Sequence, residues 1–139
     1  MQKTIMLFLI LYLSSVVSVW AGSIIIIANK DVSLSSLTGD ELQRIFLGKK
    51  TTWNNGKKIV PVCLKSGKSH ESFIRNYMDM NASQFDIFWK QVVFIGTGRP
   101  PRSFVDEAYV VQFVMSTKGG IGYIDSDTRH GMVKTLAVK

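Results

Sequence analysis

Cysteine and histidine are scarce in this chain of 139 residues. The single cysteine, Cys63, cannot form an internal disulfide, and its place within an apolar run favours a buried, inert thiol over a reactive one. Glu71 follows His70 as it does in zinc-protease helices, but the second histidine would have to fall at position 74, which is Ile74. The sequence therefore excludes a disulfide framework and predicts no metal centre.

Residues 1–21 have the pattern of an export signal. Lys3 gives a positive start, residues 5–19 form an apolar run, and positions 19–21 resemble a signal-peptidase cleavage site. An uncleaved membrane anchor is the alternative, because the run approaches the ~17 residues of the shortest spanning helices. We favour cleavage, which predicts a single domain over 22–139 that is periplasmic or secreted and has no stable membrane span.

Acidic residues are also few. They number 10 against 17 lysines and arginines, which gives a formal net charge of +7. Such an excess raises the local concentration of anions. Nucleic acid is not the expected partner, because the sequence has no basic helix or aromatic platform motif and an exported protein meets little nucleic acid. A solvated surface explains most of these charges, and only the few near one helix start bear on a small anion.

Predicted strands and helices alternate along the rest of the chain. Apolar runs predict strands at 24–28, 58–64, 121–124 and 133–138. Apolar spacings of three and four predict helices that begin at Thr38, after Ser69, at Ser83 and at Asp106. The third helix has the strongest apolar stripe, which we expect to face the core: Phe85, Phe88, Trp89, Val92 and Val93. This order predicts an α/β fold, a single three-layer domain with a small mixed, mostly parallel sheet of about four strands.

The loop between the second predicted strand and the next helix is rich in small, hydroxyl-bearing and basic residues. It comprises Lys65, Ser66, Gly67, Lys68, Ser69 and His70. Ligands of open α/β sheets bind at such loops, where backbone amides and the positive helix end face an anion. A nucleotide P-loop is excluded, because the glycine it needs five positions earlier is Val62. Two interpretations stay open: these residues bind an anion, or a serine caps the helix and both lysines are solvated.

Several motifs follow one another in a characteristic order. Thr38 can cap a helix while Glu41 reaches back to its amide, Gly48 can end that helix, and Trp53 follows in a Trp-Asn turn. The strand at 59–62 and the Gly-Gly-Ile-Gly-Tyr-Ile string at 119–124 come later. Together these motifs resemble one lobe of the phosphate-type substrate-binding proteins of ABC transporters, which have the type 2 periplasmic-binding fold.

The resemblance implies a non-enzymatic solute-binding protein that holds a small oxyanion such as phosphate at 65–70. It also implies an ABC permease or another envelope protein that supplies the opposite wall, because the chain has material for one lobe only. The corresponding loop of full-length members carries an arginine and an aspartate. Here the arginine has no secure equivalent and the aspartate is absent, so the resemblance does not carry phosphate specificity to this chain.

Two other functions compete with solute binding. An envelope interaction or accessory module that kept one lobe without ligand binding would use exposed loops at 53–56 and 99–102 as contact surfaces. An exported hydrolase would need a nucleophile, a base and an orienting group, and no such set can be assembled from the sequence. We therefore expect no enzymatic activity, no catalytic residue and no cofactor.

Overall fold

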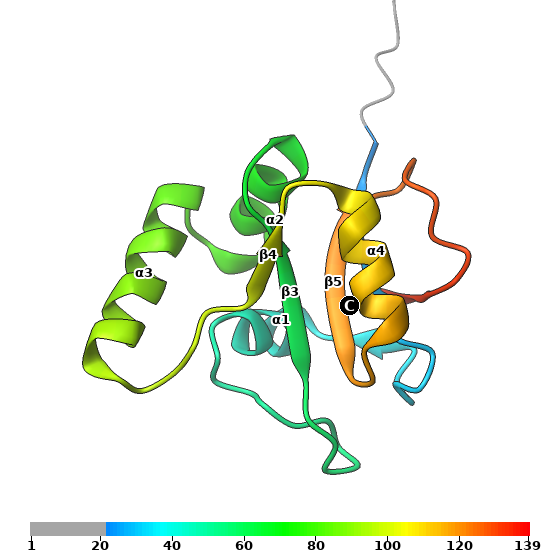
Figure 1. Cartoon of the computed structure of the whole chain (residues 1–139), viewed down its shortest axis with the longest axis horizontal. Helices are drawn as coiled ribbons and strands as arrows, with labels where there is room; N and C mark the ends of the chain where they lie inside the picture. Colours follow the sequence, from blue (N-terminus) through cyan, green and yellow to red (C-terminus); the bar gives the residue numbers. More distant parts are fainter. Residues whose placement is uncertain (1–21) are drawn as a thin grey trace, which may run out of the picture.

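The structure is a computed structural model that describes residues 22–139, so the predicted signal peptide at 1–21 lies outside the described residues. Figure 1 shows the arrangement of the elements. In chain order they are β1 (Ile24–Ala28), β2 (Ser36–Leu37), α1 (Gly39–Phe46), β3 (Val60–Leu64), α2 (Lys68–Met78), α3 (Ala82–Ile95), β4 (Arg102–Phe104), α4 (Glu107–Ser116), β5 (Gly120–Asp125) and β6 (Lys134–Val138). Within this range no helix is long and apolar enough to cross a membrane.

The six strands form one mixed sheet in the order β2-β6-β1-β5-β3-β4. β1 is antiparallel to both of its neighbours, β5 and β6, whereas β2 with β6, β3 with β5, and β3 with β4 are parallel pairs. All strands except β1 therefore share one direction, which confirms a mixed, mostly parallel sheet. The expected number of about four strands was too low, because β2 and β4 have only two and three residues and show no apolar period.

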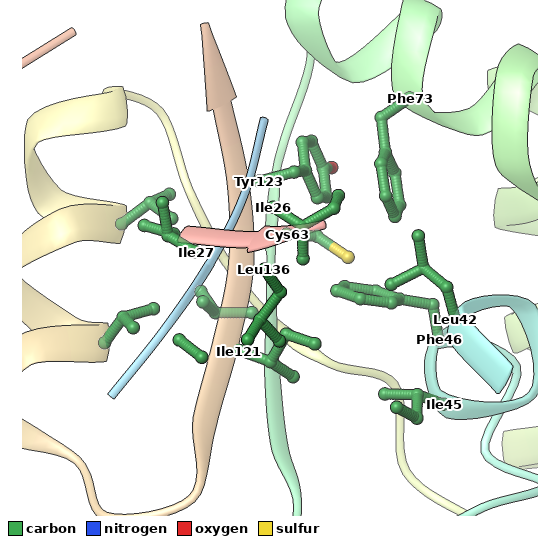
Figure 2. Close-up of a cluster of buried hydrophobic side chains, with 14 of the residues drawn as sticks. Ile26, Ile27, Leu42, Ile45, Phe46, Cys63, Phe73, Ile121, Tyr123 and Leu136 are labelled. Carbon is green, nitrogen blue, oxygen red and sulfur yellow. The ribbon is translucent and has the colours of Figure 1, made fainter. Parts of the chain in front are cut away.

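Helices cover both faces of the sheet and complete the predicted three-layer domain. α4 lies on one face, while α1 and α2 lie on the other (Figure 1). Neighbouring residues of β1 pack against the helices on opposite faces of the sheet, because successive strand side chains point to opposite faces. Figure 2 shows Ile27 directed toward α4 and Phe46 and Phe73 gathered on the opposite side. All three side chains are fully buried.

Close packing of α4 depends on a glycine in β5. A Cβ atom at Gly122 would lie 2.9 Å from Cγ1 of Val62 and 3.0 Å from Cγ1 of Val110. Both distances are too short for ordinary packing, so a side chain here would push α4 away from the sheet. The glycine of the Ile-Gly-Tyr string thus sets the spacing between two layers.

α3 follows the predicted helix only in part. Its N-cap is Asn81, whose side chain accepts from the Gln84 amide at 2.8 Å, so the predicted start at Ser83 was wrong. Phe85 and Trp89 are buried as expected, but Val93 is 52% exposed. The stripe fails at this end because α3 packs mainly against α2 and extends beyond it (Figure 1).

Candidate functional site

The predicted binding loop lies where β3 ends and α2 begins. Lys65 follows the last residue of β3, and its amide donates to the carbonyl of Phe104 at 2.9 Å, which ties the loop to the end of the neighbouring strand β4. Gly67 has φ of +99°, a left-handed conformation that favours glycine. The side chains from Lys65 to Lys68 are exposed and Ser69 is half-buried. These residues thus gather at the carboxyl ends of the parallel strands β3 and β4; the sequence predicted the position after β3 but not the neighbouring strand β4.

The amino end of α2 has backbone amides to offer. The amide of Glu71 is the first that bonds within the helix, to the carbonyl of Gly67 at 3.0 Å. No side chain in the described part of the chain caps α2, so the interpretation in which Ser66 or Ser69 caps the helix is not observed. Uncapped amides at a helix start carry partial positive charge that an anion can neutralise.

Glu71 opposes that positive charge. It lies in the first turn of α2, is exposed, and adds a carboxylate beside the helix start. A negative side chain at this position stabilises the helix through its dipole, and it competes with any external anion. The site therefore combines uncapped backbone amides, which attract an anion, with the Glu71 carboxylate, which repels it.

His70 differs from the other loop residues, because its ring is buried. Its Nδ1 lies 2.5 Å from the hydroxyl of Tyr123, which accepts from the amide of Leu64 at 3.0 Å. The Tyr123 hydroxyl therefore joins the His70 ring to the backbone at the end of β3. Burial lowers the pKa of His70, against the opposing effect of Asp86, and the neutral ring fits this role. His70 thus supports the loop from within the core.

Burial also determines the chemistry of the groups next to His70. It raises the pKa of the Cys63 thiol to about 12, and it raises the pKa of Tyr123 above its ordinary value. Both groups stay protonated at neutral pH. The prediction that Cys63 is buried is confirmed. Among residues 22–139 no cluster of three or more metal-ligating side chains is present.

A cavity of about 580 Å³ opens beside the loop, between α3 and the ends of β3 and β4. Lys65 and His70, at the two ends of the loop, both line it, and Asp86 and Lys90 of α3 supply further charges. Most of the remaining wall is apolar: Leu64, Phe85, Trp89, Val93, Pro100 and Pro101. A ligand held at the loop would therefore meet an apolar surface on one side.

Two residues that shape the site could not be found from local sequence patterns. Tyr123 is 53 positions from His70, and Asp86 belongs to a different helix. Neither contact has a local pattern, although the Ile-Gly-Tyr string that contains Tyr123 could be recognised as a motif. The side-chain partner of a loop is set by tertiary packing, which periodicity does not report.

The Trp53 motif, by contrast, is structural. Its indole Nε1 donates to the carbonyl of Gly119 at 3.2 Å, and the side chain is only 4% exposed. The proposed contact surface at 53–56 therefore lacks its aromatic residue, because Trp53 faces inward. The motif joins the region after α1 to the start of β5.

Solved structures of phosphate receptors share this fold. An ABC-type phosphate transport receptor from Vibrio cholerae matches with a TM-score of 0.66 and 16% identity, over 84% of this chain and 46% of that chain. A Clostridium perfringens protein described as a phosphate ABC transporter substrate-binding protein was solved with bound phosphate. It matches with a TM-score of 0.67 and 19% identity, over 84% of this chain and 45% of that chain. PstS from Borrelia burgdorferi matches with a TM-score of 0.64 and 16% identity, over 85% of this chain and 47% of that chain.

These likenesses confirm the fold predicted from the motif order. The chain spans about half the length of the structures it matches, as expected for a single lobe. No family model matches the sequence. No curated protein matches it either.

Proposed function

We propose that residues 22–139 form an exported, non-enzymatic solute-binding module that holds a small oxyanion at the amino end of α2. The observation that supports this most directly is the uncapped start of α2 at the carboxyl end of β3, in a fold shared with phosphate receptors. Backbone amides from Lys68 to His70 would donate to the anion. The hydroxyl of Ser69 and the ammonium of Lys65 would add charge-assisted contacts.

The module lacks the enclosure that a second lobe would give. Most of its loop side chains are exposed, so a bound anion would stay partly hydrated and each contact would be weakened by the high local dielectric. We propose that an ABC permease or another envelope protein supplies the opposite wall. Binding by the isolated module would then be weak, in the millimolar range, and would tighten in the assembly.

Isothermal titration calorimetry with phosphate and sulfate tests the anion site. We expect weak binding at low ionic strength that decreases in Ser69→Ala and Lys65→Gln variants. Lys118→Gln is the matched control, because this exposed lysine lies after α4 and away from the loop. Absence of heat at millimolar anion, or equal loss in the Lys118 control, would contradict the proposal. Export is tested separately, by determining the amino terminus of the protein recovered from the periplasm.

Glu71 favours a second candidate function. Its carboxylate repels anions from the helix start, which is the outcome expected of an accessory module that kept the lobe and lost the ligand. Such a module would bind an envelope protein equally well with and without added anion. Cross-linking in cells followed by identification of the partner, repeated with phosphate depleted, separates the two functions.

A further inference from the structure

The carboxyl end of α3 presents apolar side chains to solvent. Val93, Phe94 and Ile95 are 52%, 91% and 70% exposed, and Gly96 then ends the helix with a φ of +80°. We call these three residues the α3 tip. Consecutive helical residues are about 100° apart around the axis, so the tip is apolar over most of the helix circumference.

This distribution differs from that of a helix that docks in a protein groove. Such a helix presents one stripe at spacings of three and four, with polar residues opposite. The tip instead has three adjacent apolar residues, and α3 stands apart at one side of the molecule (Figure 1). A projection that is apolar in nearly every direction suits a medium that surrounds it, such as the acyl region of a lipid bilayer.

A basic hollow adjoins the tip. It has a volume of about 250 Å³ and is lined by Lys50, Lys58, Arg99 and Arg102, together with Trp89 of α3 and residues 59–61 of the β3 region. The described residues that line it include no acid. A shallower hollow, which Arg99 also lines, connects this surface to Val93 and Gly96.

Three of these four cations are available to a ligand. The Arg102 guanidinium lies 5.3 Å from the ring centre of Phe104, so it is already occupied by a cation–π contact. Within residues 22–139 no ion pair involves Lys50, Lys58 or Arg99. The hollow therefore provides positive charge next to an exposed apolar projection.

We propose that the α3 tip and the basic hollow together bind the surface of a membrane that contains anionic phospholipid. Phe94 and Ile95 enter the acyl boundary, while Lys50, Lys58 and Arg99 contact headgroup phosphates. Apolar insertion and attraction to anionic lipid reinforce each other in peripheral membrane binding. This proposal does not depend on the anion site at α2, because it uses none of the residues 65–70.

Flotation with lipid vesicles tests the proposal on the chain that begins at Gly22. We expect binding to vesicles of phosphatidylcholine and phosphatidylglycerol, and little binding to phosphatidylcholine alone. Binding to the anionic vesicles should be weaker in 0.5 M salt, because the screening length falls to about 4 Å. A Phe94→Ser, Ile95→Ser double variant should need about tenfold more lipid for half-binding. Arg99→Gln should lower binding only to the anionic vesicles.

Met132→Ser is the matched control. Met132 is 62% exposed and lies in the segment between β5 and β6, so its loss removes a similar apolar group from another surface. The control should bind vesicles as the unchanged chain does. The proposal is overturned if the chain binds no vesicles at millimolar lipid, or if the double variant binds like the control. Concentration-dependent dimers that the double variant abolishes, without vesicle binding, would assign the tip to a second copy of the chain instead.

Discussion

The two ends of the parallel strands β3 and β5 differ in how their polar groups are partnered. At the amino ends, the amide of Gly119 donates to Asp31 at 3.1 Å, and its carbonyl accepts from Trp53 and from the amide of Val60 at 3.2 and 3.0 Å. At the carboxyl end of β3, within the described residues, the start of α2 has no side-chain cap. The polar groups at the amino ends, which we call the closed end, are paired with one another. The start of α2, which we call the open end, has backbone donors without a side-chain partner.

This difference separates residues that identify the fold from residues that could bind a ligand. The motif residues Trp53 and Gly119 contact each other across 66 positions and hold the sheet together. The loop at 65–70 contributes little to that framework, apart from the Lys65 amide and the His70 ring. A motif can therefore specify the ancestry of a domain while saying nothing about what the domain now binds. Four changes test the contrast, from the largest expected effect to the smallest.

Gly119→Ala should disrupt the closed end. Gly119 has φ of +77°, and a Cβ atom there would lie 2.1 Å from the carbonyl oxygen of Lys58. Strain and clash together should lower the free energy of unfolding by about 3 to 5 kcal/mol, measured by urea denaturation. Gly56→Ala is the control, because φ is +81° but no described atom lies within 4 Å, so only about 1 kcal/mol should be lost. Equal losses in the two variants would contradict the role of the Gly119 contact.

Tyr123→Phe should weaken the inner support of the open end. The change leaves the buried amide of Leu64 without its acceptor and removes the partner of His70 Nδ1. The free energy of unfolding should fall by about 1 to 3 kcal/mol in urea denaturation, the range for an unsatisfied buried donor. Tyr109→Phe is the control, because Tyr109 is exposed and its change should cost less than about 0.5 kcal/mol. An unchanged stability in Tyr123→Phe would show that this hydroxyl does not hold the loop.

Local patterns accounted for the framework of the fold. The strands β1, β3, β5 and β6 and all the expected helices are present, because buried apolar runs and helical spacing are properties of neighbouring residues. The prediction failed where tertiary contacts decide. Val93 belongs to an apolar stripe but extends past α2, and Trp53 lies in a polar turn but is buried against Gly119.

The candidate site was predicted to a similar extent. Its position at a strand-to-helix loop follows from topology, which the sequence specifies well. The conformations of the site residues do not follow from topology. Ser66 and Ser69 are ordinary capping residues in sequence, yet neither caps α2 within the described chain. His70 lines the cavity beside the loop, but its buried contact with Tyr123 could not be predicted from neighbouring residues.

The burial of His70 should make stability depend on pH. Burial lowers its pKa below the ordinary 6.5, so between the two values the unfolded chain binds more protons than the folded one. The contribution of His70 to the free energy of unfolding is therefore full above pH 6.5. It is lost on acidification, by at most about 1.4 kcal/mol per pH unit. Urea denaturation of the unchanged chain and of His70→Asn from pH 7.5 to 5 should give curves that differ in slope within this window. Parallel curves would mean that His70 does not titrate differently in the two states.

Glu71→Gln should have the smallest effect and acts on the open end alone. Removing the carboxylate from the first turn of α2 leaves the uncapped amides without a competing negative charge. Anion affinity should rise about two- to fivefold in calorimetry at low ionic strength, as expected for a charge within a helix dipole. Glu41→Gln is the matched control, because Glu41 lies in the first turn of α1, whose amide end is already capped by Thr38. An affinity that falls in Glu71→Gln, or rises equally in both variants, would mean that the amino end of α2 is not where the anion binds, and that the unpartnered donors there serve only the solvent.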